Sequence, residues 1–422
     1  MNNSFSEPQK SPFDAWTDNV GSVDDPSTII ATIPGTLGYY PQESIIVIGL
    51  VPDPECGGEL VLGPMLRADI VHAGQLADFL STAPVEQCVA FLGVMVTRMP
   101  HSESAEAAVQ ELEDLTRPCG EPVVDVLWHV SEIAQGTPYE MVFGPDPENM
   151  ERQWPELKWG RGTVASVVTS PAMRAWRENG ILPALNRSDT FDFFQPDSYP
   201  GGATVGGERV DITALTRDAQ LYADALRRQI DRGSNEPGRV VRDAMQALVD
   251  APAQPLIGLD QRHSLEQTFA DRGALRALVT VLSRSMLRDC VIGTAVRHPQ
   301  ESAAALLAVA RAFDGVVRAN ALSLWGIVAI SRGLSSWASA ALAVAQEELP
   351  QHSMSAICLE ILAAGEQQHL VTTILQGCKL ACAHIVGTGD GNYRGPHDRN
   401  HVASNRDFED PGEEYGDQAA SA

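Results

Sequence analysis

Residues 37–50 read LGYYPQESIIVIGL, and this stretch decides how the chain begins to fold. From Ser44 to Leu50 it is a nearly unbroken apolar run of strand length, which predicts a buried strand. Before it, Gly38, Pro41 and Ser44 stand at an even spacing of three. Glycine can take a positive φ, proline fixes its own φ, and serine bonds nearby backbone groups, so the spacing predicts a structured turn into the strand. The alternative is a ligand site at that end of the strand.

Outward from this stretch, apolar runs alternate with helical segments. The further strands that we predict are residues 59–70, 88–96, 123–130 and 139–143. The segment AQGTP joins the last two as a hairpin. The predicted helices are residues 73–80, 104–115 and 170–180. Strands separated by helices predict a sheet covered on at least one face. We therefore predict an α/β domain over residues 25–195, with a mixed sheet and flanking helices.

The pattern changes near residue 200. Residues 196–207 are rich in glycine and are predicted to be a linker. From 208 to 384, apolar residues recur at spacings of three and four, which predicts an all-α domain. Within it, residues 319–351 match the small and large positions of one tetratricopeptide unit, a pair of antiparallel helices. We predict one such helix pair followed by a capping helix, rather than a long array.

Both ends of the chain are predicted to be disordered. Residues 1–24 are polar and contain proline, and residues 385–422 form an acidic tail with almost no large aliphatic side chains. Segments of this composition cannot bury enough apolar surface to offset the entropy of ordering them.

The overall charge restricts the expected partners and location. The chain has 422 residues, and 30 basic against 55 acidic residues give a formal net charge of -25. A surface this acidic repels phosphate backbones, so no nucleic-acid partner is expected. The first residues lack the pattern of a signal peptide, and no window approaches the roughly 18 apolar residues of a membrane span. Seven cysteines without a disulfide framework suit a reducing compartment. We expect a cytoplasmic protein with no membrane partner.

Motifs of cofactor binding and catalysis are missing from the sequence. There is no GxxxxGK[ST] or GxGxxG phosphate loop, no GxSxG elbow and no HExxH. Cys378, Cys382 and His384 stand close together, and a zinc site would need Cys358 as its fourth ligand. Buried thiols on a core-facing helix are the simpler interpretation. We expect no cofactor and no metal.

Three further groups of side chains have both a structural and a functional interpretation. Arg67 and Asp69 share one face of a strand; they either hold a carboxylate or phosphate ligand or form an ion pair at a sheet edge. Arg288 and Asp289 are predicted to bridge two helices. Residues 154–162, WPELKWGRG, form a predicted loop. Its tryptophans either make a ligand platform or pack the loop over the sheet.

Taken together, these stretches resemble an uncharacterised actinobacterial family, domain of unknown function 4192. The likeness begins at DDPSTIIATIPGTLGYYPQESIIVIGL and continues through LRADI, the strand carrying Trp128, and SPAMRAWRENGILPALNRSD, which contains Arg187. It ends with LRDC and the closing helix pair, and covers about residues 25–365. Between 130 and 165 this chain lacks the family's cysteine-containing, proline-rich stretch, so any binding function of that stretch is not expected here. The resemblance implies a fold and no established activity.

The sequence favours a non-enzymatic scaffold or regulator that binds a protein partner through the helical domain. This prediction is based on the tetratricopeptide-like pair, the acidic surface and the absence of a catalytic motif. The alternative is a small-ligand sensor or enzyme with its site at the strand ends of the α/β domain. Its candidate residues are Ser44, Arg67, Asp69, Trp128 and Arg187. Polar groups converging in a cleft would favour the ligand, and side chains paired off on different faces would favour the scaffold.

Overall fold

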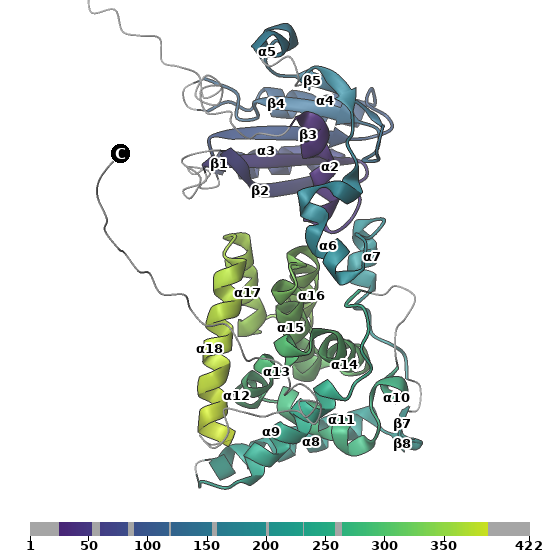
Figure 1. Ribbon diagram of the computed structural model, residues 1–422, viewed down its shortest axis with the longest axis vertical. Helices are drawn as coiled ribbons and strands as arrows, with labels where there is room; N and C mark the ends of the chain where they lie inside the picture. The colour runs from purple at the N-terminus through teal and green to yellow at the C-terminus, as the bar shows by residue number, and fades with distance from the viewer. Residues whose placement is uncertain are drawn as a thin grey trace, which may run out of the picture.

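The computed structural model describes residues 25–52, 60–82, 88–117, 120–153, 158–199, 202–230, 232–257 and 264–386. An α/β region stands above a helical region in Figure 1, with α6 and α7 at the junction. This arrangement confirms the predicted fold class. The predicted tail at 1–24 lies outside the described residues, as do residues 387–422 of the tail predicted at 385–422. The first two residues of that second tail, Ile385 and Val386, belong instead to the last helix.

A six-stranded mixed sheet organises the first region. The strands follow the order β2 (Leu60–Asp69), β1 (Ser44–Pro52), β3 (Ala90–Val96), β4 (Val126–Val130), β5 (Pro138–Phe143) and β6 (Arg161–Thr163). Only β3 and β4 are parallel. They are joined through α4 (Glu103–Glu113), because a parallel pair needs a crossover connection. The predicted hairpin between β4 and β5 is present.

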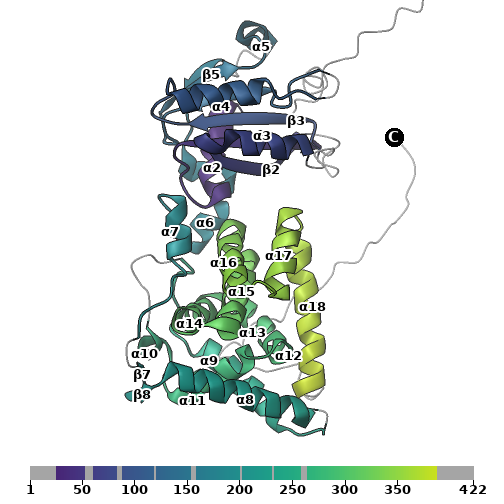
Figure 2. The same cartoon turned by 180° about the vertical axis from the view of Figure 1, so that it is seen from behind.

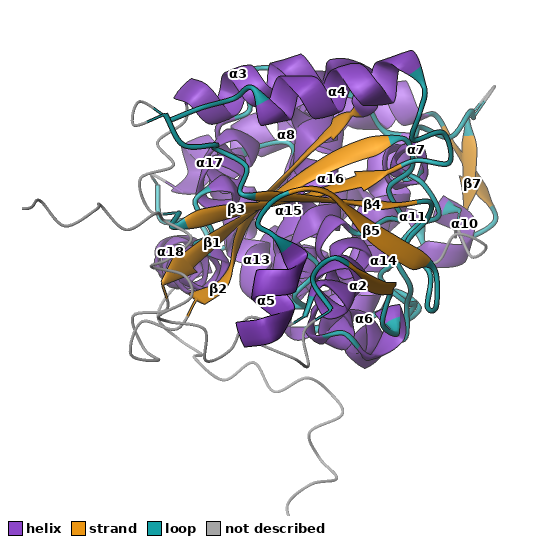
Figure 3. Cartoon of the chain, turned by 90° about the horizontal axis from the view of Figure 1, so that it is seen from above, coloured by secondary structure: helices purple, strands orange, loops and turns teal. Residues whose placement is uncertain are grey.

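Helices cover both faces of this sheet (Figure 3). Ile45 and Val47 of β1 face a core shared with α3 (Ala73–Thr82) and α4. Ile46 and Ile48, one residue out of phase, face a second core shared with α2 (Pro26–Leu37) and α6 (Arg174–Asn179). Because side chains alternate along a strand, coverage on both faces requires the continuous apolar run that the sequence shows.

The second region is helical. A small hairpin of β7 (Ala203–Val205) and β8 (Glu208–Val210) precedes it, so the second half of the predicted linker is a strand and a turn. Its helices are α8 (Ile212–Ile230), α9 (Glu236–Val249), α10 (Leu265–Thr268), α11 (Arg272–Leu282), α12 (Ser285–Arg288), α13 (Ile292–Arg297), α14 (Pro299–Ala312), α15 (Gly315–Ser331), α16 (Ser335–Glu348), α17 (Ser353–Ala363) and α18 (Gln367–Val386). Seen from behind in Figure 2, α17 and α18 form one edge of this region.

Helices α15 and α16 pack against each other at small residues. A methyl group on Gly326 of α15 would lie 3.1 Å from Leu342 Cγ and 3.5 Å from the Ala338 carbonyl of α16. The spacing of small and large residues in the sequence thus marks a real close approach between two neighbouring helices. Its similarity to a tetratricopeptide unit stays a prediction.

Two phenylalanines join the α/β region to the helical region. Phe193 and Phe194 follow α7 (Arg187–Asp192), and both are buried. Phe193 packs edge-on against Trp337, with ring centroids 5.2 Å apart, and Phe194 packs edge-on against Trp325 at 4.9 Å. Edge-to-face aromatic pairs stabilise a contact by about 0.5–1.5 kcal/mol beyond the area that they bury. Four rings therefore form a compact anchor at the junction.

Buried arginines of the helical region satisfy the backbone of this anchor. Arg311 donates to the Phe193 carbonyl at 3.1 Å, and Arg318 donates to the Phe194 carbonyl at 2.8 Å. Each guanidinium also has an acidic partner: Asp197 for Arg311, and Glu348, at 3.1 Å, for Arg318. The segment after α7 is consequently fixed to the helical region through both its side chains and its carbonyls.

Gly38 is a second point of contact between the regions. It ends α2 in the left-handed conformation, with φ of 81°. Its carbonyl accepts hydrogen bonds from the backbone N–H of Ala184 at 2.9 Å and from Trp337 Nε1 at 3.1 Å. The glycine of the opening turn therefore ends the helix and also binds the helical region.

We predict that Gly38→Ala destabilises the protein by about 2–4 kcal/mol. The strain of a positive φ costs about 1–2 kcal/mol, and overpacking adds more, because the new methyl group would lie 2.4 Å from Ser336 Oγ. Gly180→Ala is the matched control: Gly180 also ends a helix at positive φ, 66°, but its added methyl group would meet nothing within 4 Å. Urea unfolding measures both variants, and equal losses would contradict the packing role of Gly38.

Candidate functional site

One edge of the sheet brings together the ends of four strands. Ser44 at the start of β1 pairs with Asp69 at the end of β2 and with Val96 at the end of β3. Val96 in turn pairs with Val130 at the end of β4. In open α/β sheets, ligands bind outside the carboxyl ends of parallel strands. Most of the predicted site residues lie at this edge, on one of its two faces.

On the α2 face, Ser44, Arg67 and Asp69 bind one another. Arg67 donates from Nε and Nη2 to Ser44 Oγ at 2.9 and 2.7 Å, and from Nη2 to Asp69 at 2.5 Å. The Ser44 hydroxyl donates to the Gln42 carbonyl at 2.7 Å, which uses its one hydrogen. The side chain of Arg67 is only 11% exposed. The hydrogen-bonding groups of these three residues are largely occupied by one another, so we interpret them as a stabilising contact between β1 and β2 at this edge. Their role in ligand binding stays a prediction.

The structure places Arg187 near this group and Trp128 in the core. Arg187 is exposed at the start of α7, with its guanidinium 5.7 Å from the centre of the Phe191 ring. Burial raises the pKa of Tyr39, and the charges of Arg67 and Arg187 oppose that rise, so both cations lie near its phenol. Trp128 is fully buried on the same face of the sheet.

Trp128 contacts Trp159 of the tryptophan-containing loop, which shows how that part of the loop is held. Its Nε1 donates to the carbonyl of Trp159 at 2.8 Å, and the two ring centroids are 5.4 Å apart. Trp159 is itself buried, so this part of residues 154–162 packs over the sheet. Trp154 lies outside the described residues.

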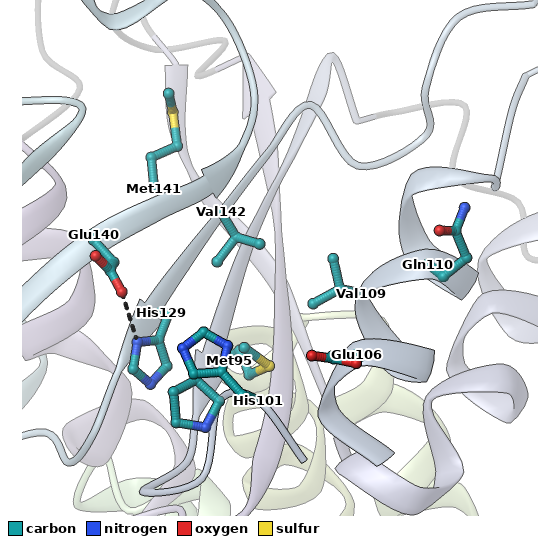
Figure 4. Close-up of a pocket in the computed structure, with 10 residues that line it drawn as sticks. Met95, His101, Glu106, Val109, Gln110, His129, Glu140, Met141 and Val142 are labelled. Atoms are coloured by element: carbon teal, nitrogen blue, oxygen red, sulfur yellow. Dashed lines mark ion pairs between the residues drawn. The ribbon is translucent and has the colours of Figure 1, made fainter. Parts of the chain in front are cut away.

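The α4 face of the same edge contains a cavity of about 310 Å³ (Figure 4). It lies between α4, the loop after β3, and the strands β3, β4 and β5. The lining residues are Met95, Pro100, His101, Glu106, Val109, Gln110, His129, Glu140, Met141 and Val142. Five of these ten residues are apolar and five are polar or charged, so the lining offers both apolar contacts and polar groups to a ligand.

Strand register and helix periodicity place these side chains together. Met95, His129 and Glu140 are paired across β3, β4 and β5, so they lie side by side on one face. Glu106 and Val109 are three residues apart and thus share one side of α4. That helix begins after the loop that follows β3, and Ser102 Oγ caps its first turn by accepting a hydrogen bond from Ala105 N.

His129 has a fixed orientation in the cavity wall. Its Nε2 is 3.0 Å from the Thr97 carbonyl, and its Nδ1 is 3.6 Å from a Glu140 carboxylate oxygen. Since a carbonyl can only accept, Nε2 carries a proton and Nδ1 faces the carboxylate.

The loop that carries Thr97 is held by a strained residue. Glu43 has φ of 43° and is the one non-glycine residue with positive φ in the described part of the chain. Its carboxylate accepts from Thr97 Oγ1 at 2.7 Å and from Arg98 N at 3.3 Å. Strained conformations of this kind concentrate at functional sites.

A family model matches residues 26–368, more than three quarters of the chain. Its description is Domain of unknown function (DUF4192). The chain belongs to this family. It matches no curated protein and no solved structure. The match spans both the α/β region and nearly all of the helical region, so the family includes the two regions together.

The cysteines of α18 lie in the core beside the segment that follows α12. Cys382 Sγ is 3.1 Å and Cys378 Sγ is 3.6 Å from the Cys290 carbonyl. The hydrogen bond with Cys382, and then burial, raise the pKa of Cys378, which keeps it protonated. Within the described ranges, no three histidine, cysteine or acidic side chains are placed to hold a metal ion.

Arg288 and Asp289 take part in a buried network that connects several helices. Arg288 donates to Asp289 at 2.6 Å and to Asn320 Oδ1 of α15 at 2.5 Å. That same oxygen accepts from His352 Nε2 at 2.9 Å. His352 also caps α17, because its Nδ1 accepts from Ser355 N at 3.3 Å. Since His352 is only 6% exposed and its ring nitrogens are bonded within the network, we interpret the network as structural.

We predict that His352 makes the protein less stable in acid. Burial, together with the nearby charge of Arg288, lowers its pKa from 6.5 to about 4. The unfolded chain therefore takes up a proton first as the pH falls, so stability is greatest above about pH 7 and declines towards pH 4. Between pH 7.5 and 5, the wild type should lose roughly 2 kcal/mol more than His352→Asn.

Urea unfolding of both proteins at the two pH values gives this difference directly. Asparagine can still cap α17 but does not titrate. Burial raises the pKa of Asp125 to about 6, an effect of opposite sign that cancels because both proteins contain it. Identical pH dependence in the two proteins would show that His352 has no such effect.

Proposed function

We propose that this protein binds a small organic ligand in the cavity on the α4 face of the sheet edge. The observation that supports this proposal most directly is the cavity of about 310 Å³ beside the carboxyl ends of β3 and β4. Its volume lies at the lower end of the range for ligand sites, and its place agrees with the rule for open α/β sheets.

The lining supports binding rather than covalent catalysis. It has imidazole and carboxylate groups, but none of its residues is a serine, threonine, cysteine or lysine. A hydroxyl, thiol or amine nucleophile is therefore absent from this lining, and its carboxylates and imidazoles are the groups that remain for chemistry or for binding. Of the two predicted classes, a ligand sensor fits this lining better than an enzyme.

Filling the cavity should abolish binding. We predict that Val109→Trp and Gln110→Trp remove the hits found with wild-type protein in a ligand-observed NMR screen of small organic molecules. Both residues line the cavity, and Gln110 is exposed at its rim, so its substitution leaves the core intact. Val168→Trp is the control, since Val168 is 52% exposed and lies outside the lining. A screen without hits, or hits that both filled variants retain, would refute the proposal.

The second candidate function is the one that the sequence favours: binding of a protein partner by the helical region. Its support is the outer face of α17 and α18, where Ile357 is 54% and Leu380 74% exposed. Residues His369–Val386 of α18 are long and apolar enough to cross a membrane by length and composition, which corrects the expectation that no window of the sequence is, and 17% of that window is buried. This helix has no acidic residue in a chain of net charge -25. An exposed apolar helix that carries a lysine, Lys379, and no acidic side chain on an acidic protein is typical of a partner surface.

We predict that Leu380→Glu releases a partner that the wild type retains. A buried carboxylate in the centre of an apolar contact would cost more than the contact gains. Leu221→Glu is the matched control, because Leu221 is 64% exposed on α8. Affinity capture with the full chain compares the three proteins. A partner retained equally by all of them would exclude this face of α18.

The cytoplasmic location and the absence of a nucleic-acid partner stay predictions based on the sequence.

A further inference from the structure

We propose that the ligand of the α4-face cavity is an organic cation, an amine with an apolar body. This inference rests on the proposed ligand-binding function and names its chemical class. It follows from the charges, the apolar floor and the geometry of the described lining.

The fixed charges of the cavity are negative. Glu106 and Glu140 are its two carboxylates, and the lining includes no lysine or arginine. Figure 4 shows them on opposite walls, Glu106 on α4 and Glu140 on β5. The N-terminus of α4 adds a partial positive charge of about 0.5, which is smaller than the two negative charges that face it. The whole chain, at -25, adds to the same preference.

The two carboxylates differ in how much they are already bound. Glu140 is 3.6 Å from His129 Nδ1, and its side chain is 71% exposed. Glu106 is exposed, and its carboxylate has no hydrogen bond or ion pair with any residue that the structure describes. An ammonium group of a ligand can therefore form a charge-assisted hydrogen bond with Glu106 without displacing a protein partner.

The floor of the cavity suits an apolar body. Met95 is only 2% exposed, and Val109 lies beside it in Figure 4, with Val142 at the β5 side. Thioethers make favourable contacts with aromatic rings of about 0.3–1.5 kcal/mol. The exposed imidazole of His101, next to His129, adds a flat surface at the rim. An arylalkyl amine matches this combination of floor and rim.

Two other ligand classes fit less well. Imidazoles and carboxylates are metal ligands, but no three such groups of the described chain are placed to hold an ion. An anionic ligand would lie between two carboxylates without a lysine or arginine in the lining to neutralise it.

The test compares three molecules that share an apolar body and differ in charge. These are 2-phenylethylamine, 2-phenylethanol and 3-phenylpropanoate, titrated into the full chain by calorimetry or NMR. We expect the amine to bind most tightly. Glu106→Gln, which keeps the side-chain volume, should weaken the amine roughly three- to tenfold and leave the alcohol unchanged. Glu113→Gln is the control, because Glu113 is exposed on the same helix and outside the lining.

The outcomes separate this inference from the function on which it rests. If the alcohol or the carboxylate binds as tightly as the amine, or if the cavity screen yields only neutral or anionic hits, the cationic class is wrong and the ligand site remains. An amine affinity that Glu106→Gln and Glu113→Gln leave equally unchanged also refutes the inference. If neither the three compounds nor any molecule of the NMR screen binds, the proposed function and the ligand class fail together.

Discussion

The carbonyl of Gly38 receives two hydrogen bonds, and most of the architecture depends on them. The N–H of Ala184 comes from the loop before α7, and Nε1 of Trp337 comes from α16. Trp337 also packs on Phe193, which connects the α/β region to the helical region. One helix terminus thus fixes the position of a loop, a helix and an aromatic cluster. Because glycine is needed here for both its φ and its lack of a side chain, the turn that precedes β1 has little freedom to vary.

The two faces of the sheet edge have different consequences for function. On the α2 face, Arg67 is nearly buried, and its guanidinium is bound by Ser44 and Asp69. On the α4 face, the polar groups surround an open space, and the Glu106 carboxylate is solvated rather than paired. Charged side chains that satisfy one another stabilise a fold, whereas those that face a cavity keep their bonding capacity for a ligand. For this reason we place the candidate site on the α4 face.

Local patterns predict most of the secondary structure and little of the site. The strands and the helix ends at Ser102 and Gly180 follow from apolar runs and capping residues close in sequence. The ion pair of Arg67 with Asp69 could be expected, because the two residues share one face of a predicted strand, whereas the contact of Arg67 with Ser44 depends on the pairing of β1 with β2. The cavity could not, since its residues come from four elements and meet only through strand register. The role of Arg311 and Arg318 could not be predicted either. Only the folded structure brings the segment at Phe193 beside them, where they bind its carbonyls.

The core on the α2 side of the sheet has no internal boundary. Buried residues form one continuous cluster from Ile29 of α2, through Trp128 and Phe193, to Ile385 of α18. The division into two regions that is clear in the ribbon is therefore not a division in packing. Apolar surface shared in this way couples the two regions during unfolding. A separate core on the α4 side of the sheet, which includes Leu76, Phe91 and Leu112, lies entirely within the first region. A cut between the two regions would therefore expose the shared apolar surface on both of them and leave the α4-side core whole.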